Sequence, residues 1–296
     1  MKQVRKERLI RLLTALAAAV LCFITRRWQL NSAFEGEFGL PRLMAPATIV
    51  VIGLWVLFAV ILILLNLKTA VGPEIYENPH LALSAEQDHL IFGALLCSAV
   101  LTLLAAPAML REGYRMWSDF NAVIRYGNKI PGGNNGLLVL ATAGTSALAF
   151  IALLVVAKVT FRNTQKGRLA ILLPAINNCL WLMEIYRASA PDPILWNYIP
   201  LLLAIVCGIL FYLDWAGLYA GLCAPRRLLW MAGMTVALTA SALAGVWSFG
   251  SAMLLFSQLI AALAVLWCVP KNLKYPPELP AEETPAEEKL EEETHE

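Results

Sequence analysis

Apolar residues follow one another in long, mostly uncharged runs along the greater part of the chain. A helix rises about 1.5 Å per residue, so about 20 such residues are needed to cross a hydrocarbon layer about 30 Å thick. The runs that meet this requirement lie at 44–65, 90–110, 136–156, 169–186, 194–213, 228–247 and 251–269. Each of these seven runs is predicted to be a transmembrane helix.

An eighth run, at 12–25, is shorter. It is uncharged for 14 residues, or about 21 Å of helix, so Arg11 and Arg26 would have to extend their side chains outward. The basic residues before it are also typical of a secretory signal. Small residues of a cleavage site are missing, however, and an uncleaved first helix is predicted. The fold class is therefore all-α, a polytopic transmembrane helix bundle of about eight spans, or seven if the first segment is interfacial.

Two segments between the runs have patterns of their own. Residues 110–124 place aromatic and aliphatic side chains at helical spacing beside a stripe of arginines, which predicts a helix lying in the membrane interface. The glycine cluster at 131–136 lacks the lysine and hydroxyl residue of a phosphate loop, and it is predicted to be a turn.

The composition agrees with a membrane protein. Hydrophobic residues make up 59% of the 296 residues and charged residues 15%, with a mean hydropathy of +0.65. Soluble domains carry roughly 45–50% apolar and about 25% charged residues. A water-soluble fold could not bury this excess, so we expect the lipid bilayer to be the main partner of the chain.

The charge is divided unevenly along the sequence. The net charge is +2, but residues 276–296 hold nine glutamates and one lysine, which leaves +10 on the rest of the chain. With four prolines and few apolar residues, this segment cannot offset the entropy of ordering. We predict a transmembrane bundle over 1–275 and a disordered acidic tail over 276–296. The tail either solubilises the terminus or docks a basic protein partner.

Basic residues also predict the orientation, because lysine and arginine accumulate on cytoplasmic loops. With eight spans and the N-terminus inside, 15 of the 23 basic residues are cytoplasmic, and with seven spans 16 are. Both arrangements place the acidic tail in the cytoplasm.

Polar residues share one face of the fifth predicted span. The face contains Pro174, Asn177, Asn178, Trp181 and Glu184, with Arg187 one turn further on. Ionisable groups at membrane depth are costly and often functional, so this face is a candidate substrate or ion site. The alternative is structural: Glu184 pairs with Arg187, and the asparagines form hydrogen bonds between helices.

A second charged residue, Asp214, ends the sixth span. Its position along the helix places it at the interface opposite to that of Glu184, where Arg226 and Arg227 are the expected partners.

Small residues recur at the spacing that lets helix backbones approach closely. One set is Gly217 and Gly221, and the other is Gly233, Ala237, Ser241 and Gly245. Both are predicted to pack helices within the bundle.

The sequence offers little for catalysis. The six cysteines and three histidines have no metal or redox spacing, and no cofactor is expected. The string Gly144-Thr145-Ser146-Ala147 is similar to that of rhomboid-like proteases, but the intramembrane histidine base is missing. Basic residues lie mostly at helix ends, so nucleic-acid binding is not expected.

The stretch from Leu173 to Gly221 resembles a block found in polytopic membrane proteins of Firmicutes, especially gut clostridia. The matching residues are Pro174, Trp181, Tyr186, Arg187, Asp192, Pro193, Tyr198, Tyr212, Ala216 and Gly217, with Phe38 to Pro41 earlier in the chain. The resemblance implies a bacterial plasma-membrane location and about eight helices, and it implies no activity. Asp214 is an addition to the pattern.

Two function hypotheses follow. The first is a non-enzymatic accessory, scaffold or sensor protein whose cytoplasmic acidic tail engages a partner. The second is a transporter of a small molecule or ion that uses the polar face of the fifth span.

Overall fold

The computed structural model describes residues 2–34, 42, 45–67, 69, 71–72, 75, 78–84, 88–125, 135–162, 167–189, 195–245 and 248–274. The predicted tail, most of the glycine turn, and the Asp192-Pro193 pair lie outside these residues. In chain order the elements are α1 (Lys2–Ser32), α2 (Pro46–Leu67), η1 (Pro79–Leu83), α4 (His89–Arg125), α5 (Gly136–Arg162), η2 (Arg168–Ile171), α6 (Leu172–Ser189), α7 (Leu195–Tyr219), α8 (Pro225–Leu243) and α9 (Phe249–Asn272). The described residues contain no strand, and the predicted all-α helix bundle is confirmed.

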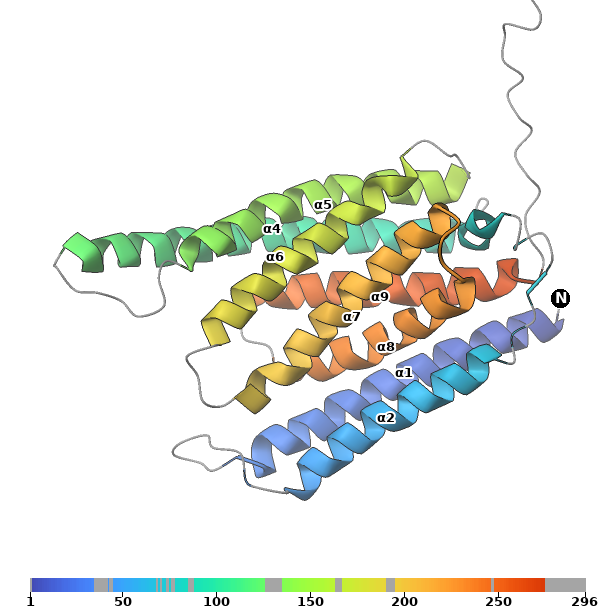
Figure 1. The fold of residues 1–296 in the computed structure, drawn as a ribbon, viewed down its shortest axis with the longest axis horizontal. Helices are drawn as coiled ribbons and strands as arrows, with labels where there is room; N and C mark the ends of the chain where they lie inside the picture. Colours follow the sequence, from blue (N-terminus) through green and yellow to red (C-terminus); the bar gives the residue numbers. More distant parts are fainter. Residues whose placement is uncertain are drawn as a thin grey trace, which may run out of the picture.

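The long helices lie side by side and alternate in direction (Figure 1). The start of α1 and the end of α9 lie at one end of the bundle, here called the proximal end, and the other end is called the distal end. Helix α8 is central, with α1, α2, α7 and α9 as its neighbours, while α4 packs against α5 and α9. Helix α6 lies between α5 and α7.

In the part of the chain that the structure describes, seven helices are long and apolar enough to cross a membrane, within α1, α2, α4, α5, α6, α7 and α9. The multi-pass membrane character of the chain is thereby supported. The most apolar part of α2 is only 17% buried, against 61% for α9. Large apolar side chains such as Ile49, Val56 and Leu64 lie exposed along α2, as a helix in contact with lipid requires.

Among the described residues, the long helix that does not meet this criterion is α8 rather than the first segment. It has 19 residues, about 28 Å of helix, and covers most of the span predicted at 228–247. Its neighbours enclose it, and 14 of its residues are buried. A helix with little lipid contact does not need a fully apolar surface, which explains its threonines and serine.

The predicted 14-residue first segment was too short, because α1 extends over 31 residues. Arg11 and Arg26 do not extend outward; they are buried, with 7% and 1% of their surface exposed. Arg11 donates to Asn66 Oδ1 (2.7 Å) and to the Leu65 carbonyl (3.0 Å). Arg26 donates to Gln29 Oε1 (2.6 Å). Hydrogen-bond acceptors on the helices replace water, so the charged positions do not end the span.

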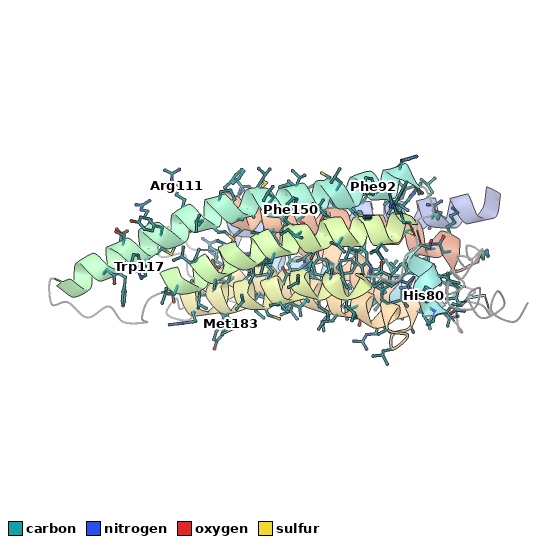
Figure 2. The ribbon with its side chains drawn as sticks, turned by 90° about the horizontal axis from the view of Figure 1, so that it is seen from above. His80, Phe92, Arg111, Trp117, Phe150 and Met183 are labelled. Atoms are coloured by element: carbon teal, nitrogen blue, oxygen red, sulfur yellow. The ribbon has the colours of Figure 1, made fainter. Side chains whose placement is uncertain are left out.

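The helix predicted at 110–124 is present, but it is not a separate element, because α4 is continuous from His89 to Arg125 through Pro107. Figure 2 shows Arg111 and Trp117 on the part of α4 that extends toward the distal end. The approach of α5 is close there: a Cβ on Gly136 would lie 2.6 Å from the Trp117 amide nitrogen. This backbone contact lets the extension remain attached to α5.

Candidate functional site: the polar interior around α6

The polar face predicted on α6 is the buried face of that helix. Pro174, Asn177, Asn178, Trp181 and Glu184 are all buried. Arg187, at the distal end of the helix, is exposed. The spacing along the sequence therefore identified which side chains point into the bundle.

Asn177 connects α6 to α5. Its Oδ1 accepts hydrogen bonds from Thr145 Oγ1 (2.8 Å) and Ser146 Oγ (3.1 Å). Ser146 Oγ also lies 2.8 Å from the Thr142 carbonyl. The hydroxyls of the protease-like string thus have structural partners.

Asn178 connects α6 to α9 through Gln258. Gln258 was not among the candidate residues predicted from the sequence. Asn178 Nδ2 donates to Gln258 Oε1 (3.0 Å). Gln258 Nε2 donates to the Ala204 carbonyl (2.8 Å) and to Thr239 Oγ1 (3.2 Å). One buried amide side chain therefore joins α6, α7, α8 and α9. The feature of the sequence that could have indicated this role is the position of Gln258, an amide residue, within an apolar span.

Space for the Gln258 side chain comes from α7. A Cβ on Gly208 would lie 2.1 Å from Gln258 Oε1. Only glycine fits at this position while the amide keeps its place.

A hydroxyl cluster joins α4 to α9 beside this amide. Ser98 Oγ and Ser257 Oγ lie 2.9 Å apart, and Thr102 Oγ1 lies 2.7 Å from Ser257 Oγ. Ser257 Oγ also donates to the Ser98 carbonyl (2.8 Å). The three hydroxyls satisfy one another and the α4 backbone.

A small cavity lies where these contacts meet. It is lined by Thr102, Ala149, Leu153, Pro174, Asn177, Asn178, Tyr212, Leu254, Ser257 and Gln258. Its volume, counted for the centre of a water-sized sphere, is about 10 Å³, which is room for about one water molecule. The asparagines thus line a cavity that neighbouring helices close, and Glu184 is not part of its lining.

Glu184 and Trp181 lie further along α6, toward the distal end. Glu184 is 8% exposed and Trp181 is fully buried. The Thr142 side chain of α5 forms a hydrogen bond with Glu184. Glu184 Oε2 and Trp181 Nε1 have no hydrogen-bond partner among the described residues. A carboxylate oxygen without a donor is the least satisfied group on this face.

Asp214 lies at the proximal end, away from Glu184, as predicted. It forms an ion pair with Arg227, whose Nε lies 3.1 Å from Asp214 Oδ1. The aspartate side chain is 6% exposed and the arginine side chain 58%. This pair anchors the α7–α8 turn at the edge of the bundle.

The small residues of α8 face α1 and α2. A Cβ on Gly233 would lie 2.7 Å from Leu62 Cδ1 of α2. Ala237 packs in a cluster with residues of α1 and α2, and Ser241 is fully buried. Gly245 lies in the turn after α8, where its amide donates to the Ala242 carbonyl (3.0 Å).

Gly217 and Gly221 lie at the end of α7. Gly221 has φ +73°, and the Leu222 amide donates to the Gly217 carbonyl (2.8 Å). A Cβ on Gly217 would lie 3.1 Å from Cys223 Cβ of the same turn. Here the glycines form the C-terminal turn of the helix.

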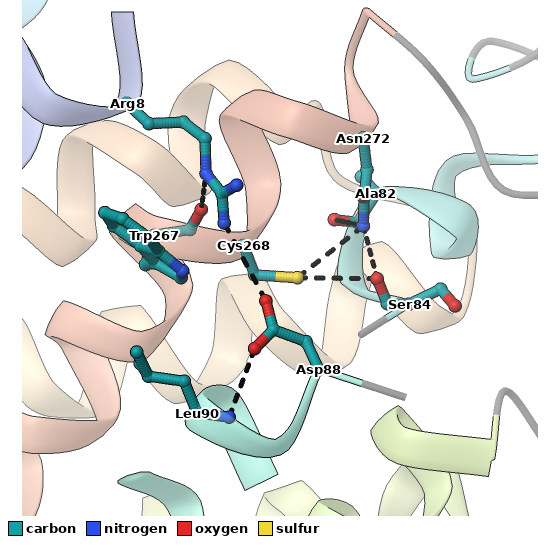
Figure 3. A network of polar contacts seen from close by, with 8 residues as sticks. All are labelled: Arg8, Ala82, Ser84, Asp88, Leu90, Trp267, Cys268 and Asn272. Atoms are coloured by element: carbon teal, nitrogen blue, oxygen red, sulfur yellow. Dashed lines mark hydrogen bonds and ion pairs between the residues drawn. The ribbon is translucent and has the colours of Figure 1, made fainter. Parts of the chain in front are cut away.

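A second polar network closes the proximal end (Figure 3). Arg8 Nε donates to the Trp267 carbonyl (2.8 Å), and its guanidinium lies 4.2 Å from the centre of the Trp267 ring and 3.9 Å from Asp88. Asn272 Nδ2 donates to the carbonyls of Ala82 (3.1 Å) and Ser84. The start of α1, η1 with the residues after it, and the end of α9 are thereby joined.

Beside this network, His80 of η1 lies half-buried near η2. Burial lowers the pKa of His80, and the nearby charge of Arg168 lowers it further. The Arg168 guanidinium lies 5.6 Å from the centre of the Tyr219 ring.

Among the described residues, no three histidine, cysteine or acidic side chains gather as metal ligands. No protein-family model, curated protein or solved structure matches the chain.

Proposed function

We propose that this chain is a non-enzymatic accessory or scaffold protein of a bacterial plasma membrane, and that its acidic C-terminal segment engages a cytoplasmic protein. The observation that carries the proposal is the closed interior. The two asparagines of α6 are occupied by partners on α5 and α9, and the cavity between them has room for about one water molecule. Such contacts are suited to holding helices together.

We also propose an orientation, which the distribution of basic residues supports. Eight long helices among the described residues alternate in direction and place the start of α1 and the end of α9 at one end. Counted by their order along the sequence, 15 of the 23 basic residues belong to segments on the proximal side and 8 to segments on the distal side. The excess favours a cytoplasmic proximal side. The nine glutamates after residue 275 would then be available to a basic cytoplasmic partner.

Crosslinking in cells tests this proposal. The full chain is compared with a variant lacking 276–296 and with a variant in which the nine glutamates of that segment become glutamines. We expect one partner to be recovered with the full chain and lost from both variants, at equal expression. An unchanged set of partners in both variants would contradict the proposal.

A second candidate, transport of a small molecule or ion, is favoured by one observation. Glu184 has a buried carboxylate oxygen without a donor among the described residues, and unsatisfied acidic groups at membrane depth often bind ions or protons. Because the cavity beside α6 is closed, transport would require a path for the solute to open along this helix.

Solute uptake into proteoliposomes tests the second candidate. Under transport, Glu184→Gln should reduce uptake at least tenfold while the protein still folds. Asp119→Asn, at an exposed acidic position on α4, should leave uptake unchanged. Equal uptake by the Glu184 variant and the unmodified chain would eliminate the α6 site.

A further inference from the structure

A groove between α2 and α8 lies apart from the polar interior, at the proximal end of the bundle. It is lined by Ile63, Asn66 and Leu67 of α2 and by Arg226, Arg227 and Trp230 of α8. Its volume is about 280 Å³, far larger than that of the cavity beside α6. The groove is open on the outer surface of the bundle, where lipid contacts α2.

The lining residues change from aliphatic side chains to arginines along the groove, and the arginines line it with the apolar atoms of their side chains. Ile63 and Leu67 are 44% and 65% exposed, and the Trp230 indole is held by a hydrogen bond from Nε1 to the Ala59 carbonyl (3.3 Å). Two arginines lie one turn before this tryptophan, at the start of α8. An apolar wall below a basic rim at the end of a transmembrane helix has the polarity of a phospholipid, whose chains are apolar and whose headgroup carries a phosphate.

Two nitrogen donors of the lining have no acceptor among the described residues. Asn66 is 6% exposed; its Oδ1 accepts from Arg11, but its Nδ2 has no partner. Arg226 Nη2 donates to the Thr69 carbonyl (2.8 Å), but its Nε has no partner. A buried donor without an acceptor is costly. Both nitrogens are themselves buried, so an oxygen-rich ligand in the groove would satisfy them once the Asn66 and Arg226 side chains turn toward it.

The local charge favours an anion. The guanidinium groups of Arg11, Arg226 and Arg227 belong to this region; Asp214 pairs with Arg227, whereas Arg11 and Arg226 donate to the neutral oxygens of Asn66 and Thr69. Arg227 remains 58% exposed despite that pair. In addition, α8 begins after Ala224 without a side-chain cap, so the positive end of its dipole faces the same region.

We propose that this groove binds an anionic phospholipid of the proximal leaflet. The phosphate lies between Arg226, Arg227 and Asn66, and an acyl chain runs along Ile63, Leu67 and Trp230. Basic pockets between transmembrane helices are known to hold anionic headgroups. The inference is independent of the proposed scaffold function.

Native mass spectrometry of the full chain, released from nanodiscs, tests this site. Nanodiscs of phosphatidylcholine with 20% phosphatidylglycerol are compared with phosphatidylcholine alone. We expect one phosphatidylglycerol to remain bound to each chain. Arg226→Gln should weaken its retention about fivefold, as expected for the loss of one basic contact near the membrane surface. Arg162→Gln, an exposed position at the proximal end of α5, is the matched control and should retain the lipid.

Two further arms make the result decisive. Ile63→Trp fills the groove without changing charge, and it should displace the lipid although every arginine remains. Inorganic phosphate at 50 mM should not release the bound lipid, whereas release would indicate a site for free phosphate. Equal retention of the two lipids, or retention unchanged in both Arg226→Gln and Ile63→Trp, would overturn the proposal.

Discussion

Replacing Gln258 by leucine tests whether the polar interior holds the bundle together. Leucine has nearly the same volume, so the substitution removes the amide and leaves little empty space. It abolishes the hydrogen bonds to the Ala204 carbonyl, Thr239 Oγ1 and Asn178 Nδ2. Those bonds connect α9 to three other helices.

The expected magnitude follows from the number of bonds. Hydrogen bonds between helices in membranes contribute about 0.6 kcal/mol on average and at most about 1.7 kcal/mol. Three of them correspond to about 2 kcal/mol of unfolding free energy. At about 2–4 °C per kcal/mol for chains of this order of size, Gln258→Leu should lower Tm by about 4–8 °C.

Thermal unfolding in detergent, followed by far-UV circular dichroism, measures this loss. Thr14→Val is the control, because the Thr14 hydroxyl bonds only to the Ile10 carbonyl of its own helix. A cycle with Asn178→Leu should give a coupling energy of about 0.6–1.7 kcal/mol for the Asn178–Gln258 pair. If Gln258→Leu melted at the wild-type temperature and the coupling were zero, the interior network would have no structural role.

Three further predictions concern other parts of the bundle. Gly208→Ala should destabilise the chain as much as Gln258→Leu, because its Cβ would displace the Gln258 amide. The double variant Gly208→Ala with Gln258→Ala should lower Tm by less than the sum of the two single variants. An additive loss in Tm would contradict this. Gly136→Ala should separate α5 from the α4 extension, because its Cβ would meet α4 backbone atoms; cleavage by added protease at residues 126–134 should become faster, and an unchanged rate would contradict it. The pKa of His80 is lowered by burial and, to a smaller extent, by the charge of Arg168. As pH falls, His80 therefore takes up a proton in the unfolded chain at a higher pH than in the folded chain. Stability should fall as pH falls below about 6.5. His80→Gln should flatten this dependence of Tm on pH, and identical pH profiles would refute it.

The lipid-facing helices could be predicted from the sequence, because lipid contact requires an apolar surface along the whole span. The buried face of α6 could be predicted for a related reason, since Asn177, Trp181 and Glu184 recur at helical spacing. The central position of α8 could not be predicted in this way. Enclosed by four neighbours, this helix carries arginines and hydroxyl residues that lower its hydropathy, and no local pattern indicates which helix will be central.

Partners of polar residues could not be predicted either, because they come from distant parts of the chain. Gln258 meets Asn178 across 80 positions, and Arg11 meets Asn66 across 55. The charge of Arg11 suggested the end of a hydrophobic span, whereas acceptors on α2 allow it to remain inside the bundle. The Asp214–Arg227 pair was predictable, since the two residues lie on either side of one turn.

We propose that the chain crosses the membrane eight times, with the less apolar α8 as one of the crossings. Impermeant maleimide labelling of single cysteines, in a background without the six native cysteines, tests it directly. Leu222→Cys lies in the turn before α8, where Leu222 is 87% exposed, and Phe249→Cys lies just after α8, where Phe249 is 62% exposed. We expect the two positions to be labelled from opposite sides of sealed vesicles. Labelling of both from the same side would contradict it.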